Sequence, residues 1–179
     1  MPLKCPEGEF QRIMVYGVTG SGKTTLAARL SNLSGVKWTS VDDLTWEPGW
    51  VEVPPDVQRA KFEAICGGEE WMLDTAYGKW IDVPLARVQL IVALDYPRLL
   101  SLSRLLRRTL ARVFDKHKIC NGNIETWRQM LSHDSILVWH FRSFKSKKAR
   151  IDRFEKMENV TVVRIRSPRQ LEDWISRVS

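Results

Sequence analysis

Long apolar runs are missing from this sequence, and so is an apolar leader. No stretch of apolar residues approaches the roughly 20 that a membrane-spanning helix needs. The opening segment, MPLKCPEGEFQR, lacks the apolar core of a signal peptide. We therefore expect a cytoplasmic protein that makes no use of a membrane.

Cysteine and histidine are also scarce. Cys5, Cys66 and Cys120 are widely spaced, and no C-x-x-C pair occurs. The 3 histidines do not have the spacing of metal ligands, and we interpret them as structural or surface residues. These counts argue against a disulfide framework and against a zinc site, and they fit a reducing compartment.

The composition is that of a globular protein of modest size. The chain has 179 residues, of which 44% are hydrophobic and 27% are charged. At about 100–200 residues per domain, we expect one domain over residues 1–179, with no internal repeat.

One short motif carries clear chemistry. The segment GVTGSGKT (17–24) has the spacing G-x-x-x-x-G-K-[ST], between an apolar β-rich run at 12–16 and a segment with helical spacing that begins at Lys23. In such a loop, successive backbone N–H groups and the helix N-terminus bind phosphate, the Lys binds the outer phosphates and the Thr hydroxyl binds Mg²⁺. We therefore expect ATP to be bound by Gly17, Thr19, Gly20, Ser21, Gly22, Lys23, Thr24 and Thr25.

Strand-like and helix-like segments alternate along the rest of the chain. Alternation of this kind predicts a fold of the α/β class, with a parallel sheet flanked by helices on both faces. The expected strands are 12–16, 36–41, 71–74, 90–95 and 160–165. Expected helices include one that begins at Pro55 and ends near Cys66, and a last one capped by Ser167.

The order of these elements resembles that of P-loop kinases of the adenylate-kinase type. Five further segments are more specific, and they resemble small bacterial proteins of the topology modulation type: VDDLTWEPGW, WMLDTAYGKW, LDYPRLLSLSRLLRR, NGNIETWRQMLSHDSILVW and IRSPRQLEDWI. The likeness extends from Arg12 to Val178. It implies a P-loop NTPase fold with a five-stranded parallel sheet, flanking helices and a helical lid, and it implies nucleotide binding without defining a reaction. The chain departs from the adenylate-kinase segment D-G-F-P-R, because Asp74 is followed by TAY and the acceptor-binding Arg is missing.

Acidic residues follow two of the expected strands. Asp42 and Asp43 follow the second strand and Asp74 follows the third, so we expect all three at the edge where α/β proteins bind ligands. Carboxylates there can hold Mg²⁺ and its waters, and we expect Thr24, Asp42 and Asp74 to form the metal site. The resemblance favours Asp42 as the acid that orients a Mg²⁺-bound water or accepts a proton from the acceptor. For Asp43, capping of a short turn is an equal alternative to substrate binding.

Positive charge is concentrated in one segment. The formal net charge is +7, and residues 98–153 alone contain 14 Lys and Arg against 4 Asp and Glu, so that the rest of the chain is net acidic. Arg104, Arg107 and Arg108 lie on one face of an expected helix, and the resemblance implies that Arg104 and Arg108 act at the start of a lid over residues 109–150. A solvated basic face is the alternative, and it is the one we favour for Lys145, Lys147, Lys148 and Arg150.

The expected acceptor site lies between the second and third strands. Trp46 and Trp50 offer flat rings, Arg59 offers a cation for a phosphate, and Asp43 and Tyr77 lie nearby in sequence. Aromatic rings with a cation favour a nucleoside monophosphate as acceptor, although the Trp residues are nearly as consistent with packing of the loop. Two alternatives remain open, a nucleic-acid-associated P-loop NTPase and a kinase of a non-nucleotide metabolite.

Overall fold

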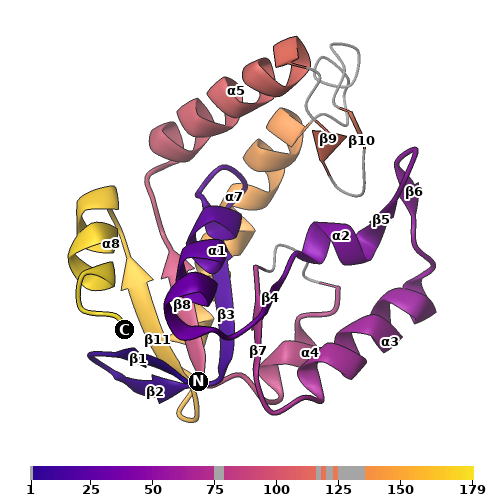
Figure 1. Cartoon of the computed structure of the whole chain (residues 1–179). Helices are drawn as coiled ribbons and strands as arrows, with labels where there is room; N and C mark the ends of the chain where they lie inside the picture. Colours follow the sequence, from indigo (N-terminus) through magenta and orange to yellow (C-terminus); the bar gives the residue numbers. More distant parts are fainter. Residues whose placement is uncertain (1, 75–78, 116–117, 120–122, 125–135) are drawn as a thin grey trace.

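A parallel sheet forms the centre of the molecule. The computed structural model describes residues 2–74, 79–115, 118–119, 123–124 and 136–179 (Figure 1). Five strands pair in the order β11-β8-β3-β7-β4, and every pairing is parallel. Their bounds are β3 (Arg12–Gly17), β4 (Trp38–Thr39), β7 (Trp71–Leu73), β8 (Leu90–Leu94) and β11 (Thr161–Ile165). The predicted fold class and five-stranded sheet are confirmed.

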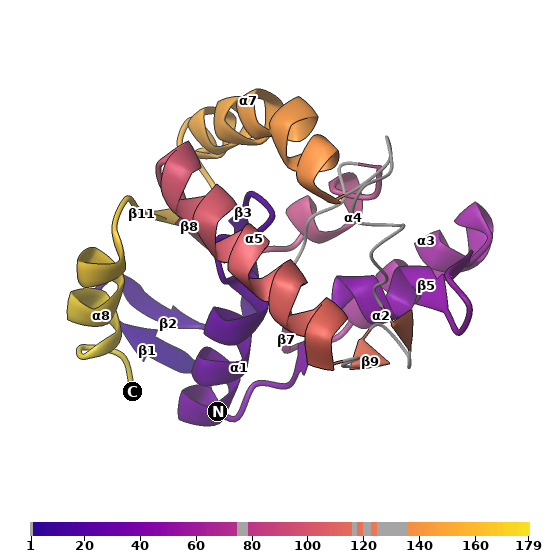
Figure 2. The same ribbon diagram turned by 90° about the horizontal axis from the view of Figure 1, so that it is seen from above.

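Helices cover both faces of this sheet, because its strands are apolar on both sides (Figure 2). Ile13 and Val15 of β3 pack in a cluster with α1 (Lys23–Ser34) and α8 (Pro168–Ile175). Met14 and Tyr16 point to the opposite face, where the helices are α3 (Pro55–Cys66), α4 (Asp82–Leu85) and α7 (Ile136–Phe154). Successive residues of one strand thus anchor both helical layers.

Helix α5 (Arg98–Asp115) lies across the end of the sheet at which β3 stops (Figures 1 and 2). It packs against α7, and the Ser101 hydroxyl lies 2.9 Å from Nε2 of the buried His140. The two helices together stand over the connection between β3 and α1.

The second strand is shorter than predicted. It ends at Thr39, and the Ser40 hydroxyl then accepts a hydrogen bond from the Asp43 N–H (3.4 Å) at the start of α2 (Val41–Thr45). Asp42 and Asp43 therefore belong to the first turn of a helix, where the macrodipole favours acids, and the predicted strand 36–41 is wrong at its C-terminal end.

Several short hairpins have no counterpart in the sequence prediction. They are β1 (Leu3–Cys5) with β2 (Gly8–Phe10), β5 (Trp46–Glu47) with β6 (Val51–Glu52), and β9 (Lys118–Ile119) with β10 (Asn123–Ile124). The last hairpin falls within the expected lid, 109–150, much of which lies outside the described residues. Among the helices that the structure describes, none is long and apolar enough to cross a membrane.

Candidate active site

The turn between β3 and α1 is built around glycine. Gly20 (φ 81°) and Gly22 (φ 96°) both have left-handed backbone conformations, which side-chain-bearing residues rarely adopt. At Gly20, a Cβ would also overlap the Ser101 carbonyl oxygen and lie 2.9 Å from Leu105 Cβ. The loop can therefore approach the backbone of α5 closely only because residue 20 has no side chain.

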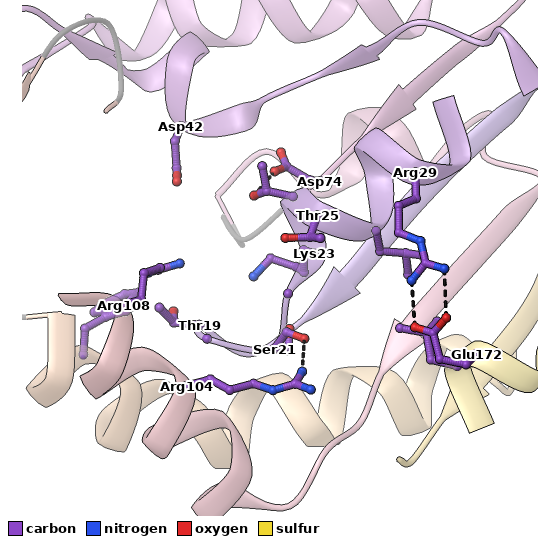
Figure 3. A pocket seen from close by; sticks show the side chains of 16 residues that line it. Thr19, Ser21, Lys23, Thr25, Arg29, Asp42, Asp74, Arg104, Arg108 and Glu172 are labelled. Carbon is purple, nitrogen blue, oxygen red and sulfur yellow. Dashed lines mark hydrogen bonds and ion pairs between the residues drawn. The ribbon is translucent and has the colours of Figure 1, made fainter. Parts of the chain in front are cut away.

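A cleft of about 580 Å³ opens above this loop (Figure 3). Its lining brings together most of the residues expected to bind phosphate, metal or the transferred group. They are Thr19, Gly20, Ser21, Gly22, Lys23, Thr24, Thr25, Asp42, Asp74, Arg104 and Arg108. Gly17 is the last residue of β3, directly below the loop.

Asp74 connects three segments of the chain. The Thr24 hydroxyl donates a 2.5 Å hydrogen bond to one carboxylate oxygen, and the Val41 N–H donates to the other at 3.0 Å. Burial raises the pKa of Asp74, although both hydrogen bonds and the Lys23 charge oppose the rise. Because Val41 precedes Asp42 in the chain, Asp74 also fixes the start of the helix that carries Asp42.

Lys23 lies at the centre of the cleft. Its ammonium donates to the Val18 carbonyl at 3.2 Å, and burial lowers its pKa while the charges of Asp74 and Asp42 partly restore it. Arg108 repels it and lowers its pKa further. In Figure 3, the side chains of Lys23, Arg108 and Asp42 point into one shared space above the loop.

Two other arginines line the side of the cleft next to α8. Arg104 donates to the Ser21 carbonyl (3.4 Å), and its guanidinium lies 5.3 Å from the ring centroid of Tyr96. Arg29 forms a two-armed ion pair with Glu172, at 2.7 and 2.8 Å. Sequence reasoning did not find this pair, because its members lie on α1 and α8, far apart in the chain.

The residues expected to bind the acceptor are not gathered in the same way. Trp46 and Trp50 do not line the cleft, and their rings pack against one another at 5.9 Å with an interplanar angle of 72°. Asp43 is exposed on α2. Tyr77 lies outside the described residues.

Arg59 is bound by neighbours on α3 and at the start of α4. It forms ion pairs with Glu63 (2.9 Å) and Asp82 (3.0 Å), and it lies 5.7 Å from the ring of Trp80. The hydrogen bond to Asp82 is the main cause of its raised pKa. Arg59 thus connects α3 to α4 in this structure and does not line the cleft.

Helix α7 differs most from its prediction as a solvated basic face. Lys147 is buried, Lys148 forms an ion pair with Asp95 (3.0 Å), and Arg150 donates to the Tyr16 hydroxyl (3.4 Å). Of the four cations, Lys145 is exposed as expected. The available signal was helical spacing, since the buried residues described in α7 recur every three or four positions: His140, Ser143, Phe144, Lys147, Ile151 and Phe154.

The residues of the cleft fit a magnesium nucleotide. Ser21 Oγ is buried and has no hydrogen-bond partner among the described residues, and it lies in a turn whose glycines leave room for an anion. The described residues contain no group of three or more His, Cys, Asp or Glu side chains that could hold a metal on their own. Thr24, Asp42 and Asp74 instead form the kind of sparse oxygen set with which Mg²⁺ is bound alongside phosphates and water.

Comparison with known proteins identifies the fold. No protein-family model matches the chain, and no curated protein matches it in sequence. A gluconokinase from Sinorhizobium meliloti 1021 has a similar structure, with a TM-score of 0.54 and 14% identity over 93% of this chain and 88% of that one. A sugar kinase from Janibacter sp. HTCC2649 gives a TM-score of 0.48 and 18% identity, over 94% and 95% of the two chains. The chain thus shares the α/β fold of this gluconokinase, and its likeness to topology modulation proteins stays a prediction.

Proposed function

We propose that this protein is a P-loop kinase that transfers the γ-phosphate of ATP to a small acceptor, with Mg²⁺ as cofactor. The observation that carries the proposal is the convergence of Lys23, Arg108 and Asp42 on one space above the phosphate loop (Figure 3). Phosphoryl transfer requires positioning and charge stabilisation at one point, and two cations that share a space with an acid suit that chemistry.

Each residue of the cleft then has a definite task. Bound ATP would supply the phosphoryl group, with Mg²⁺ neutralising part of its charge. The amides of residues 19–25 and the Lys23 ammonium would bind phosphate oxygens, and Thr24, Asp42 and Asp74 would hold the metal and its waters. In this proposal, Arg104 and Arg108 stabilise charge on the transferred group, and Asp42 orients a Mg²⁺-bound water or accepts the proton of the acceptor hydroxyl.

A nucleoside monophosphate is the first candidate acceptor, as the sequence predicts. It rests on the order of elements and on the aromatic residues between the second and third strands. In this interpretation Trp46, Trp50, Arg59, Asp43 and Tyr77 belong to the acceptor site, and the enzyme is adenylate-kinase-like.

A non-nucleotide metabolite is the second candidate, and two observations favour it. Trp46 and Trp50 pack on one another, and Arg59 is engaged by two carboxylates, so these residues present neither a stacking platform nor a phosphate-binding cation to the cleft. The structurally similar gluconokinase is a kinase of this second class by its name. A small hydroxylated acid is the kind of acceptor that this interpretation requires.

A coupled assay of ADP release decides between the candidates. Mg·ATP is incubated with AMP, CMP, UMP, GMP, dTMP, D-gluconate or shikimate, and the rate is compared with that of ATP alone. We expect one class of acceptor to raise the rate, and the Lys23→Met variant, purified in the same way, to abolish that increase. Rates that stay at the ATP-only level with every acceptor would refute a kinase of either class and leave simple ATP hydrolysis.

A further inference from the structure

Lys147 is the most unusual cation that the structure describes. Its side chain is 4% exposed, and its ammonium has no hydrogen-bond partner among the described residues. A buried charge without a partner is costly, and such groups are found where a ligand supplies the partner or where function requires them. The three other cations in this part of α7 are exposed or bonded to protein groups.

The course of α7 places Lys147 beside the phosphate loop. Two turns before it, Trp139 lines the cleft. One turn after it, Arg150 donates to the hydroxyl of Tyr16, the residue that precedes Gly17 at the end of β3. Helix α7 (Figure 2) therefore passes from the rim of the cleft to the base of the loop, and Lys147 lies along it between Trp139 and Arg150.

The charges around Lys147 are unbalanced. Lys23 and Arg150 repel it, and the carboxylate that attracts it is that of Asp42. Lys23 in turn interacts with Asp74 and Arg108. Lys147 and Arg150 beside the cleft, and Lys23 and Arg108 that line it, thus share the carboxylates of Asp42 and Asp74, and an anion would complete the site.

We propose that Lys147 is a further binding residue of the phosphoryl-transfer site, and that its ammonium binds an anionic oxygen on the face of the loop opposite Arg104. The opposite position follows from packing, because Arg104 stacks on Tyr96 in the α1–α8 cluster while α7 packs with Tyr16 on the other face of the sheet. The oxygen belongs either to the γ-phosphate or to a carboxylate or phosphate of the acceptor. The inference rests on the proposed kinase function.

Calorimetric titration of matched variants tests the proposal without turnover. Lys147→Met removes the buried charge, and Lys145→Met makes the same change at an exposed position of the same helix. Each protein is titrated with Mg·ADP and with Mg·ATP, and thermal unfolding confirms that it is folded. Lys147→Gln replaces the Met variant if the latter does not fold.

We expect Lys147→Met to weaken binding or acceptor use by roughly tenfold or more, which is typical of a lost charge-assisted hydrogen bond. A loss with Mg·ATP but not with Mg·ADP assigns the oxygen to the γ-phosphate. Unchanged nucleotide binding with a raised KM for the acceptor, found in the coupled assay, assigns it to the acceptor. Lys145→Met should match the wild type in every measurement.

Two results would overturn the assignment. One is an equal loss for Mg·ADP and Mg·ATP, which would place Lys147 away from the transferred group. The other is unchanged binding of both nucleotides together with an unchanged KM for the acceptor. If no acceptor in the panel is phosphorylated, the proposed function fails independently of Lys147. In that case, Mg·ATP binding by Lys147→Met that equals wild-type binding is sufficient to refute the role of Lys147.

Discussion

At the scale of single residues, Lys23 shows how the cleft prepares a cation for phosphate. Its own neighbours include the Val18 carbonyl, the carboxylates of Asp42 and Asp74, and the opposing charge of Arg108. Burial raises the free energy of the charged ammonium in the ligand-free protein, so a bound phosphate would gain a strong partner. This arrangement favours ligand binding over structural stability.

The first prediction follows for Lys23. Lys23→Met should lower kcat/KM for ATP by roughly 10²–10³-fold, which is typical of removing one donor at a developing charge. The fold should persist, because the variant also removes a buried charge. Steady-state kinetics and circular dichroism measure the two effects, and wild-type kinetics in a folded variant would contradict the assignment.

The second prediction concerns Asp74. Asp74→Asn retains an oxygen to accept from the Val41 N–H and an amide that can bond Thr24, so the melting temperature should change little. Activity should fall about 10–100-fold, as when the supporting shell of a metal site is altered. Raising the Mg²⁺ concentration should recover part of the loss.

The matched control is Asp173→Asn, on the exposed side of α8. It makes the same chemical change away from the cleft and should leave the Mg²⁺ dependence as in the wild type. If Asp74→Asn also leaves that dependence unchanged, Asp74 has only a structural role.

The third prediction concerns pH and Lys147. Burial lowers the pKa of Lys147 to about 7 from its usual 10.5, with further lowering by Lys23 and Arg150 and an opposing effect of Asp42. Below pH 7 both folded and unfolded chains are protonated, and the folded state bears the full cost of the buried charge. Between about pH 7 and 10.5 the folded state loses this proton first, so the cost declines as the pH rises.

Lys147→Met should therefore stabilise the ligand-free protein most at pH 6, by up to about 5 kcal/mol, and progressively less toward pH 10. Thermal unfolding at a series of pH values measures this difference, with Lys145→Met as the exposed control. A gain that is equal at pH 6 and pH 10 would show that the ammonium is not desolvated.

At the scale of elements, the contact between the phosphate loop and α5 fixes the position of one side of the cleft relative to the other. Gly20 lies against the backbone of Ser101 and the side chain of Leu105, and Arg104 of the same helix donates to Ser21. The position of Arg108 relative to Lys23 thus depends on a glycine outside the G-K-[ST] end of the motif.

The fourth prediction uses two glycines with nearly equal backbone angles. Gly20 (φ 81°) meets α5, whereas a Cβ at Gly49 (φ 83°) would have nothing within 4 Å of it among the described residues. Gly49→Ala should cost only the backbone strain, about 1 kcal/mol. Gly20→Ala should cost about 1–3 kcal/mol more and should weaken Mg·ATP binding, because α5 must shift.

Denaturant unfolding and calorimetry of the two variants separate strain from contact. If Gly20→Ala and Gly49→Ala lose equal stability and bind Mg·ATP equally well, the approach of the loop to α5 has no energetic importance.

The sequence was most informative where local signals agreed. Pro55 and Gly67 delimit α3, Ser167 caps α8, and the apolar run before Gly17 forms β3. Local signals failed for α2, because the strand before it, β4, has only two residues. So short a strand shows no alternation of apolar residues from which its end could be predicted. Local signals failed also for Lys147, because a Lys in a basic run is buried only through tertiary contacts of α7.

The residues of the candidate site also divide into those that a local sequence pattern identifies and those that it does not. The phosphate loop is one continuous segment, so its motif identifies nearly every residue that lines the floor of the cleft. The Arg29–Glu172 pair and the course of α7 depend on segments distant in sequence, and no single-sequence pattern links them. The expected acceptor residues were chosen because they are close to Asp42 in sequence. That proximity did not bring Trp46 or Arg59 to the cleft.

At the scale of the whole molecule, the question is what the net charge of +7 attracts. Several cations of the basic segment are not available to an extended polyanion. Arg104 bonds the loop, Lys147 is buried, and Lys148 pairs with Asp95. These cations are directed toward the cleft and the core, which suits a small anionic ligand better than a nucleic-acid backbone.

The last prediction follows from this distribution of charge. Single-stranded DNA or RNA should not stimulate ATP turnover, and any binding in a gel-shift series should be weak and lost by about 200 mM salt, as expected for non-specific contacts. Lys147→Met should leave that binding unchanged, because a buried ammonium cannot reach a phosphate backbone, whereas Lys145→Met should weaken it slightly. Turnover that rises several-fold with nucleic acid, at a salt concentration where binding persists, would instead favour a nucleic-acid-associated NTPase. The same result would make a small acceptor in the cleft untenable, since the cations of α5 and α7 would then serve a ligand outside it.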